Sequence, residues 1–234
     1  MEIAIVVAVI LVAVGFDYTN GFHDAANAIA TSVSTRALTP RVALILAAVM
    51  NFAGAWLGQG VATTVAETIG GISGIEGLVI VMCGLLGAIT WNLVTWWFGL
   101  PSSSSHSLIG GLVGAALLAG ATVHWMTIKD KVLIPMVLSP TIGFVLAFVV
   151  MLAFLWILRR RNPRRVNRAF RFMQTGSAAA LALGHGLQDA QKTMGVIVLA
   201  LATAMPATYH TDHLPWWVVL LAASAISAGT YAGG

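Results

Sequence analysis

The sequence predicts an all-α polytopic membrane protein built from inverted-topology repeats with broken or re-entrant helices. Three observations support this fold class. First, 59% of the 234 residues are hydrophobic and 9% are charged, whereas about 25% are charged in a typical soluble domain. Second, long apolar runs alternate with short polar turns, a pattern typical of helices that cross a bilayer. Third, two related polar motifs occur near opposite ends of the chain, as expected for internal repeats.

The first apolar run, residues 1–16, is too short to cross a hydrocarbon core of about 30 Å at about 1.5 Å per residue. Residues 17–27 therefore have to complete the crossing, although many of them are polar. Gly15 and Gly21 permit the helix to break there, and broken backbone at this depth has to line a cavity or be buried in protein. We expect a broken first helix whose polar part faces a site.

Later apolar runs predict further spans. The run at 173–205 is apolar at both ends and polar in the middle, like the first segment. His210, Asp212 and His213 are expected in a solvated outer loop rather than in a metal site. The expected spans are 42–61 (containing Asn51 and Gln59), 78–98, 132–158, 173–205 and 216–234, with a glycine-rich connection at 63–76.

The serine-rich stretch 99–107 precedes a run, 108–121, that is short for a span. The two segments predict a re-entrant hairpin with serines at its tip, or alternatively two spans. The hydroxyls of residues 102–105 lie before a helix expected to begin near His106, where unpaired N–H groups and the helix dipole favour phosphate or sulfate. A serine-rich N-cap in a solvated loop is the alternative. A Ser–His hydrolase is less favoured, because the sequence near His106 contains neither an acid nor a G-x-S-x-G motif.

The two polar motifs read Gly-Phe-His-Asp-Ala-Ala-Asn (residues 21–27) and Gly-Leu-Gln-Asp-Ala-Gln-Lys (residues 186–192), so that Asp24 recurs as Asp189, 165 positions later. A carboxylate in a bilayer costs about 2.5–3.5 kcal/mol on insertion scales and is kept when it binds a cation, carries a proton or pairs with a base. We predict that both aspartates belong to a transport site. The alternative is a purely structural salt bridge to Lys192, which could equally balance the charge of an anion.

Neutral polar groups accompany the aspartates. Asn20 and Asn27 offer amide oxygens to a hard cation or its phosphate complex, or else hydrogen bonds between helices. His23 could carry a coupling proton or be a structural histidine. Because it precedes Asp24 directly, the two side chains would diverge on a regular helix and converge on a broken one. His185 occupies the position of Asn20 in the second repeat and has the same two interpretations.

Seven of the twelve Lys and Arg residues lie between Arg159 and Arg171. Positive loops stay cytoplasmic, so this segment is expected inside, in contact with anionic lipid head groups rather than with nucleic acid. Counting back places the turn with Arg36 and Arg41 inside and the N-terminus outside, with Lys129 and Lys131 outside as a weak violation. The two motif segments then cross in opposite directions, which predicts inverted repeats in a multi-pass protein of the inner (plasma) membrane.

The organisation expected from this count is a first transmembrane repeat at 1–158 with the serine hairpin near 99–107, a basic cytoplasmic loop at 159–172, and the start of a second repeat at 173–234. A counterpart of the serine stretch would fall beyond residue 234. We therefore expect a truncated chain or a partner that supplies the missing part.

These residues resemble the inorganic phosphate transporter (Pit) family, whose repeated signature is G-x-N-D-x-A-N. The two motifs, the Pro-Ser-Ser-Ser-Ser-His stretch at 101–106 and Glu-Thr-Ile at 67–69 carry the resemblance, which covers essentially the whole chain. It implies cation-coupled uptake of phosphate by alternating access. His23, Gln188 and Lys192 depart from the signature by removing neutral oxygen ligands, which fits the bacterial proton-coupled branch with a metal–phosphate complex as substrate.

The resemblance implies a symporter rather than an enzyme, without catalytic residues, a resident metal or a tightly bound cofactor. The coupling cation is expected to be a proton, with sodium as the alternative, and magnesium could accompany phosphate. Sulfate or divalent-metal transport, a channel and a homo-oligomer stay open. Phosphate contacts are expected from Ser103, Ser104, Ser105, Asn27 and Lys192, and coupling-ion contacts from Asp24, Asp189, His23, Asn20 and Glu67, the last being alternatively a vestibule charge.

Overall fold

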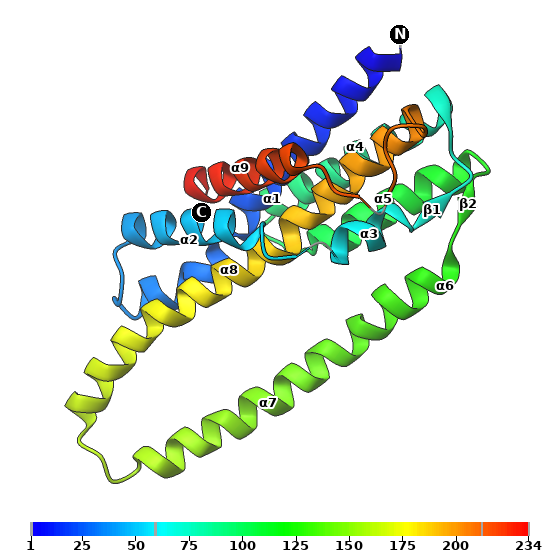
Figure 1. The fold of residues 1–234 in the computed structure, drawn as a ribbon. Coiled ribbons are helices and arrows are strands. Elements are labelled where there is room, and N and C mark those ends of the chain that lie inside the picture. The colour runs from blue at the N-terminus through cyan, green and yellow to red at the C-terminus, as the bar shows by residue number, and fades with distance from the viewer. Residues whose placement is uncertain (1, 59, 212, 234) are drawn as a thin grey trace.

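The computed structural model describes residues 2–58, 60–211 and 213–233, so the expectations for Gln59 and Asp212 lie outside the described residues. The described chain is mostly helical, with one pair of two-residue antiparallel strands (Figure 1). The elements are α1 (Glu2–Ser34), α2 (Pro40–Gly54), α3 (Gly60–Ala66), β1 (Ile69–Gly70), α4 (Gly74–Trp97), α5 (Ser104–Leu118), β2 (Thr122–Val123), α6 (Trp125–Ile128), the π-helix η1 (Lys129–Leu133), α7 (Ile134–Leu158), α8 (Pro163–Ala204) and α9 (Trp216–Ala232).

Three of the described helices are long and apolar enough to cross a membrane: α1, α4 and the continuous segment Trp125–Leu158. Helices α2, α5 and α9 are apolar but shorter. The prediction of a helical membrane protein is confirmed to this extent. The span expected at 42–61 is divided between α2 and α3, and the one expected at 132–158 belongs to a longer helix.

Helix α1 is continuous from Glu2 to Ser34, so the predicted break at Gly15 or Gly21 is wrong. Gly21 has another function, because a Cβ atom there would collide with the carbonyl oxygen of Ile226 in α9. Small residues allow two helix backbones to approach closely in a membrane protein. The glycine of the first motif therefore sets helix packing rather than a helix break.

The second motif is packed in the same way. A Cβ atom on Gly186 of α8 would collide with the carbonyl oxygen of Asn51 in α2. Each crossing also has a glycine on the partner helix: Gly229 of α9 meets the backbone of Tyr18, and Gly54 of α2 meets the backbone of α8. The α1–α9 and α8–α2 crossings are thus built alike.

Helices α4 and α5 form a tight hairpin. A Cβ atom on Gly111 would meet the carbonyl oxygen of Gly84. Helix α5 begins at Ser104, two residues before the expected start at His106, and Ser103 is its N-cap. With 15 residues, α5 is about 22 Å long and shorter than a hydrocarbon core. The hairpin presents the serines next to the middle of α8, where the second motif lies.

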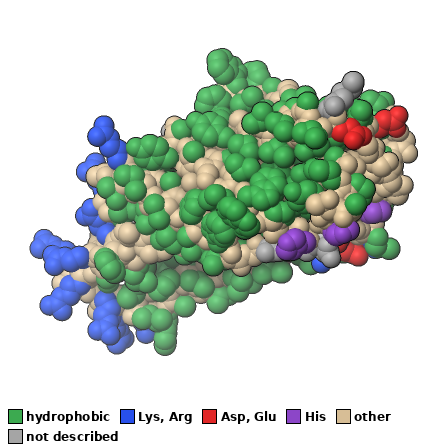
Figure 2. Space-filling model, turned by 45° about the horizontal axis from the view of Figure 1, so that its top comes forward, with side chains coloured by type: hydrophobic (Ala, Val, Ile, Leu, Met, Phe, Trp, Pro, Cys, Tyr) green, Lys and Arg blue, Asp and Glu red, His purple; other side chains and the backbone are tan. Residues whose placement is uncertain are grey.

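Helices α1 and α8 run in opposite directions through the bundle, whereas α7 stands away from it and includes no buried residue among those described (Figure 1). Lys and Arg side chains gather at one end of the molecule (Figure 2). The guanidinium group of Arg171 donates a hydrogen bond to the backbone oxygen of Arg36. The two basic segments therefore lie on the same side, as expected.

Candidate functional site

The two motif aspartates meet between α1 and α8. Asp24 and Asp189 both approach His185, whose Nε2 atom lies 3.8 Å from Asp24 Oδ2 and 3.3 Å from Asp189 Oδ2. One ligand atom from each of these three residues lies within 4.8 Å of the others. Two carboxylates and an imidazole at this spacing can share a proton or hold a cation. From the sequence, His185 is only the counterpart of Asn20 and is not among the expected site residues. In the structure it is a central member of the cluster.

Helix α1 surrounds the aspartates with further polar groups. Asn20 donates a hydrogen bond from Nδ2 to Asp189 Oδ2 at 3.0 Å, and Asn27 donates one from Nδ2 to Asp24 Oδ1 at 3.1 Å. His23 Nδ1 lies 3.0 Å from Asp24 Oδ1. The expectation that His23 needs a broken helix to reach Asp24 is wrong, since α1 is regular there. The amide of Asn27, expected to contact phosphate, is thus hydrogen-bonded to an aspartate.

Lys192 connects the aspartates to the serine stretch. Its Nζ atom lies 2.6 Å from Asp189 Oδ1 and donates a hydrogen bond to Ser104 Oγ at 3.0 Å. The lysine is buried, so neither contact is diluted by bulk solvent. Both interpretations of Lys192 that the sequence left open therefore have a structural basis, because the same ammonium group neutralises a carboxylate and faces the serines.

The orientation of His185 is fixed from the opposite side. Its Nδ1 atom lies 3.1 Å from Asn51 Oδ1, and Asn51 Nδ2 donates a hydrogen bond to Thr230 Oγ1 at 2.7 Å. A partner on one ring nitrogen determines what the other nitrogen can do. The Asn51–Thr230 pair from α2 and α9 thus directs His185 Nε2 toward the two aspartates.

The three predicted serines have different surroundings. Ser103 caps α5, its Oγ atom accepting from the backbone N–H of His106 at 3.4 Å and lying 2.7 Å from His106 Nδ1. Ser104 is buried, and its hydroxyl lies 3.5 Å from Asp189 Oδ2. Ser105 faces a cavity. The helix N-terminus is therefore present as predicted, but its hydroxyls do not converge on one point.

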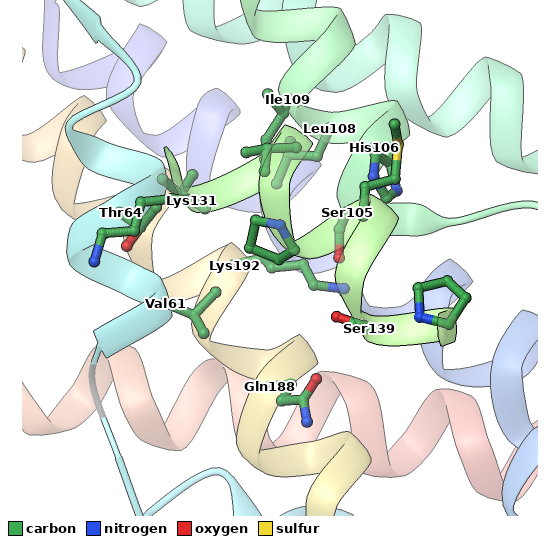
Figure 3. A pocket seen from close by; sticks show the side chains of 15 residues that line it. Val61, Thr64, Ser105, His106, Leu108, Ile109, Lys131, Ser139, Gln188 and Lys192 are labelled. Atoms are coloured by element: carbon green, nitrogen blue, oxygen red, sulfur yellow. The ribbon is translucent and has the colours of Figure 1, made fainter. Parts of the chain in front are cut away.

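That cavity has a volume of about 540 Å³ and lies between α3, α5, α8 and the η1–α7 segment. Figure 3 shows the Lys192 side chain extending between Ser105 and Ser139. A volume of this size is typical of small-ligand pockets. The wall could not be assembled from the sequence, since it combines residues of α3, α5, α8 and the η1–α7 segment, which are separate along the chain. The polar residues lining the cavity are Thr64, Ser105, His106, Lys131, Ser139, Gln188 and Lys192.

Glu67 lies apart from these groups. It is exposed, directly after α3, and its backbone oxygen lies 2.7 Å from His124 Nδ1. It is not among the described residues that line the cavity. The structure therefore brings Asp24, Asp189, His23 and Asn20 together and leaves Glu67 outside the cluster.

Three comparisons place the chain among known proteins. A family model described as "Phosphate transporter family" matches residues 20–234. A "probable low-affinity inorganic phosphate transporter" of Streptomyces halstedii is 63% identical over 189 residues, covering 80% of this chain and 89% of the relative. The protein with the same description from Bacillus subtilis is 46% identical over the full chain, which covers 71% of that relative.

The Mycobacterium leprae relative with this description is 42% identical, and the chain spans 57% of its length. A solved structure titled "The sodium-dependent phosphate transporter" matches with a TM-score of 0.81 at 20% identity, over 97% of this chain and 75% of that one. The match shows a shared helical membrane fold. With residues 20–234 covered by the family model, the chain belongs to the phosphate transporter family.

Proposed function

We propose that the protein imports inorganic phosphate by cation symport, with a proton as the coupling ion and with alternating access. This proposal rests on the ion pair of Asp189 and Lys192, which lies between a group of residues suited to a cation and a group suited to an anion. On one side lie Asp24 and His185, and on the other lie Ser104 and the cavity. A cation bound on the first side would compete with Lys192 for the Asp189 carboxylate. An anion bound on the second side would compete with Asp189 for the Lys192 ammonium group.

The competition supplies a coupling mechanism. While the site is empty, Lys192 neutralises Asp189 at 2.6 Å. A cation that binds Asp24 and Asp189 would take over this neutralisation, leaving the ammonium group available to an anion. Unit charges about 4 Å apart interact by roughly 4 kcal/mol at an effective dielectric constant of about 20, enough to couple the two binding events strongly. The proposal therefore has the cation binding before phosphate.

Phosphate is placed in the cavity, with Lys192 and Ser105 as its principal contacts. His106, Ser139 and Lys131 line the same space and add donors that the sequence did not single out. Ser103 stays a proposed contact through the N-terminus of α5, and magnesium could accompany the anion. Asn27 is a weaker candidate than predicted, because its amide is bonded to Asp24.

A proton is favoured as the coupling ion because two imidazoles contact the aspartates. His23 lies 3.0 Å from Asp24, and His185 lies between both carboxylates. Imidazole is the side chain whose ordinary titration falls near neutral pH. Sodium is the alternative, for which the Asn20 and Asn27 amides supply neutral groups nearby.

The fold proposed for this mechanism is an inverted repeat. Helices α1 and α8 carry the related motifs in opposite directions (Figure 1), and their glycines make equivalent crossings with α9 and α2. Inverted repeats with a site at their interface are common in secondary transporters. The proposal also includes the orientation and assembly of the protein. The basic end lies in the cytoplasm, the N-terminus lies outside, and the protein forms a homo-oligomer.

One observation favours a second candidate, transport of a divalent metal. Asp24, His185 and Asp189 offer oxygen and nitrogen ligands within 4.8 Å of one another, a donor set that also suits first-row metals. The hydrolase alternative is disfavoured, because His106 contacts Ser103 instead of the cavity-facing Ser105. Family membership likewise makes the chain a transporter and not an enzyme.

The test is radiolabelled phosphate uptake into proteoliposomes under an imposed proton or sodium gradient, each with and without magnesium. Proton-driven accumulation that is lost in Asp24→Asn supports the proposal. Manganese or cobalt uptake without phosphate would favour the second candidate. Sulfate uptake in place of phosphate would overturn the choice of substrate.

A further inference from the structure

Four side-chain oxygen atoms between α1 and α8 are buried without a hydrogen-bond partner among the described residues. They are both carboxyl oxygens of Asp17, Oδ1 of Asn20 and Oγ1 of Thr193. All three residues are 0% exposed. A buried polar atom without a partner costs free energy, and a buried unpaired charge costs considerably more. Such a group in a native protein needs a physical explanation.

These atoms come from facing positions of the two helices. Asp17 and Asn20 are three residues apart on α1 and so share one helix face. The hydroxyl of Thr193 on α8 lies near the Asp17 carboxyl, although the two groups do not form a hydrogen bond of ordinary geometry. The amide nitrogen of Asn20 donates a hydrogen bond to Asp189. Its amide oxygen is the atom that has no partner. The oxygen-rich position is therefore adjacent to, and distinct from, the Asp24–His185–Asp189 cluster.

The charged neighbours of Asp17 leave it uncompensated. Those that face it are Asp189, Lys192 and His185, all on α8. Helix α9 contains no Asp, Glu, Lys, Arg or His. Helix α4 carries Glu76 near its start, where Gly74 lies close to Glu2 at the far end of α1.

Lys192 is already paired with Asp189, and His185 lies between Asp189 and Asp24. Among the described residues Asp17 forms no ion pair, so either a bound metal cation or a proton taken up from solution has to neutralise its carboxylate.

We propose that Asp17, the amide oxygen of Asn20 and the hydroxyl of Thr193 form a second site for a monovalent cation. Carboxylate, amide and hydroxyl oxygens are the ligands that hard cations take, and the occupant is either sodium or a proton on the Asp17 carboxyl. Its role in coupling rests on the proposed transport function, whereas the presence of the site does not. A transporter that fills and empties this site in every cycle would move one more cation for each phosphate than the motif aspartates alone provide.

The experiment measures the thermal unfolding midpoint of the detergent-solubilised protein. Sodium chloride is titrated against choline chloride at constant ionic strength, and pH is varied separately in sodium-free buffer. If sodium occupies the site, the unfolding midpoint of the wild type rises as the sodium concentration increases. This rise disappears in Asp17→Asn and is retained in Asp24→Asn. If a proton on the Asp17 carboxyl occupies the site, the midpoint of the wild type does not depend on sodium. Asp17→Asn then becomes progressively more stable than the wild type as pH rises.

Equal sodium and pH dependence in the wild type and Asp17→Asn would overturn the proposal. If Asp17→Asn does not fold, the isosteric Thr193→Val replaces it, with Thr193→Ser as the control that keeps the hydroxyl. The proposal then expects cation half-saturation to weaken about tenfold in Thr193→Val and to stay unchanged in Thr193→Ser. Identical behaviour of these two variants would also overturn it. Unfolding midpoints do not require phosphate flux, so failure of the transport proposal is detected separately.

Discussion

Asn20 donates a hydrogen bond from its side-chain amide to the carboxylate of Asp189, with 3.0 Å between Nδ2 and Oδ2. The two residues are 169 positions apart: Asn20 directly precedes the first motif, and Asp189 belongs to the second. Asp189 also contacts Lys192, Ser104 and His185. This carboxylate therefore joins the proposed cation site to the proposed anion site.

Asp189→Asn is expected to abolish gradient-driven phosphate accumulation. The change leaves the Lys192 ammonium buried without its carboxylate partner, and breaking a buried pair in this way destabilises a protein by about 3–5 kcal/mol. Uptake assays and thermal unfolding measure the two effects. Glu67→Gln is the matched control, because Glu67 is exposed and outside the cluster. Equal losses of uptake in both variants would contradict the assignment of Asp189.

The double variant Asp189→Asn/Lys192→Gln is expected to be more stable than the sum of the two single changes predicts. Each single change deprives one buried charge of its partner in this ion pair, whereas the double change removes both charges. Coupling energies between contacting residues are about 0.5–3 kcal/mol. A double-mutant cycle of unfolding free energies measures the coupling, and additive effects would show that the 2.6 Å contact contributes nothing.

Gly186→Ala is expected to destabilise the fold, since the added methyl group would meet the Asn51 carbonyl oxygen. Overpacking of this kind costs about 1–3 kcal/mol. Gly176→Ala on the same helix has open space around the new methyl group and should be neutral or stabilise the helix by up to about 1 kcal/mol. Thermal unfolding of both variants checks this, and the account fails if the two behave alike.

Ser105→Ala and Ser103→Ala are expected to differ. Ser105 faces the cavity, so its loss should raise the KM for phosphate. Ser103 caps α5, so its loss should lower stability by about 1 kcal/mol with a smaller effect on KM. Uptake kinetics and unfolding of each variant separate the two roles. A larger KM change in Ser103→Ala would place the anion at the helix N-terminus instead of beside Lys192.

The sequence allowed the meeting of the motifs to be predicted, because Asp24 and Asp189 stand out from apolar surroundings and recur in matching positions. The capped helix start at the serines could also be predicted, since capping is a local property. Both features depend on residue type and spacing alone.

The function of the glycines could not be predicted in this way. Gly21 permits either a helix break or close packing, and only the position of Ile226 in α9 decides between them. The role of His185 depends on Asn51 and on both aspartates, which lie on three different helices. The cavity requires the η1–α7 segment to face α3, α5 and α8 across an open space, which no local pattern encodes.

The most direct test of the central claim is phosphate accumulation in proteoliposomes under an inward proton gradient, compared between the wild type and Asp24→Asn. The account predicts accumulation in the wild type that collapses when the gradient is dissipated and is absent in Asp24→Asn. Retained proton-driven accumulation in a folded Asp24→Asn protein would contradict the claim that the aspartate cluster couples the cation to phosphate.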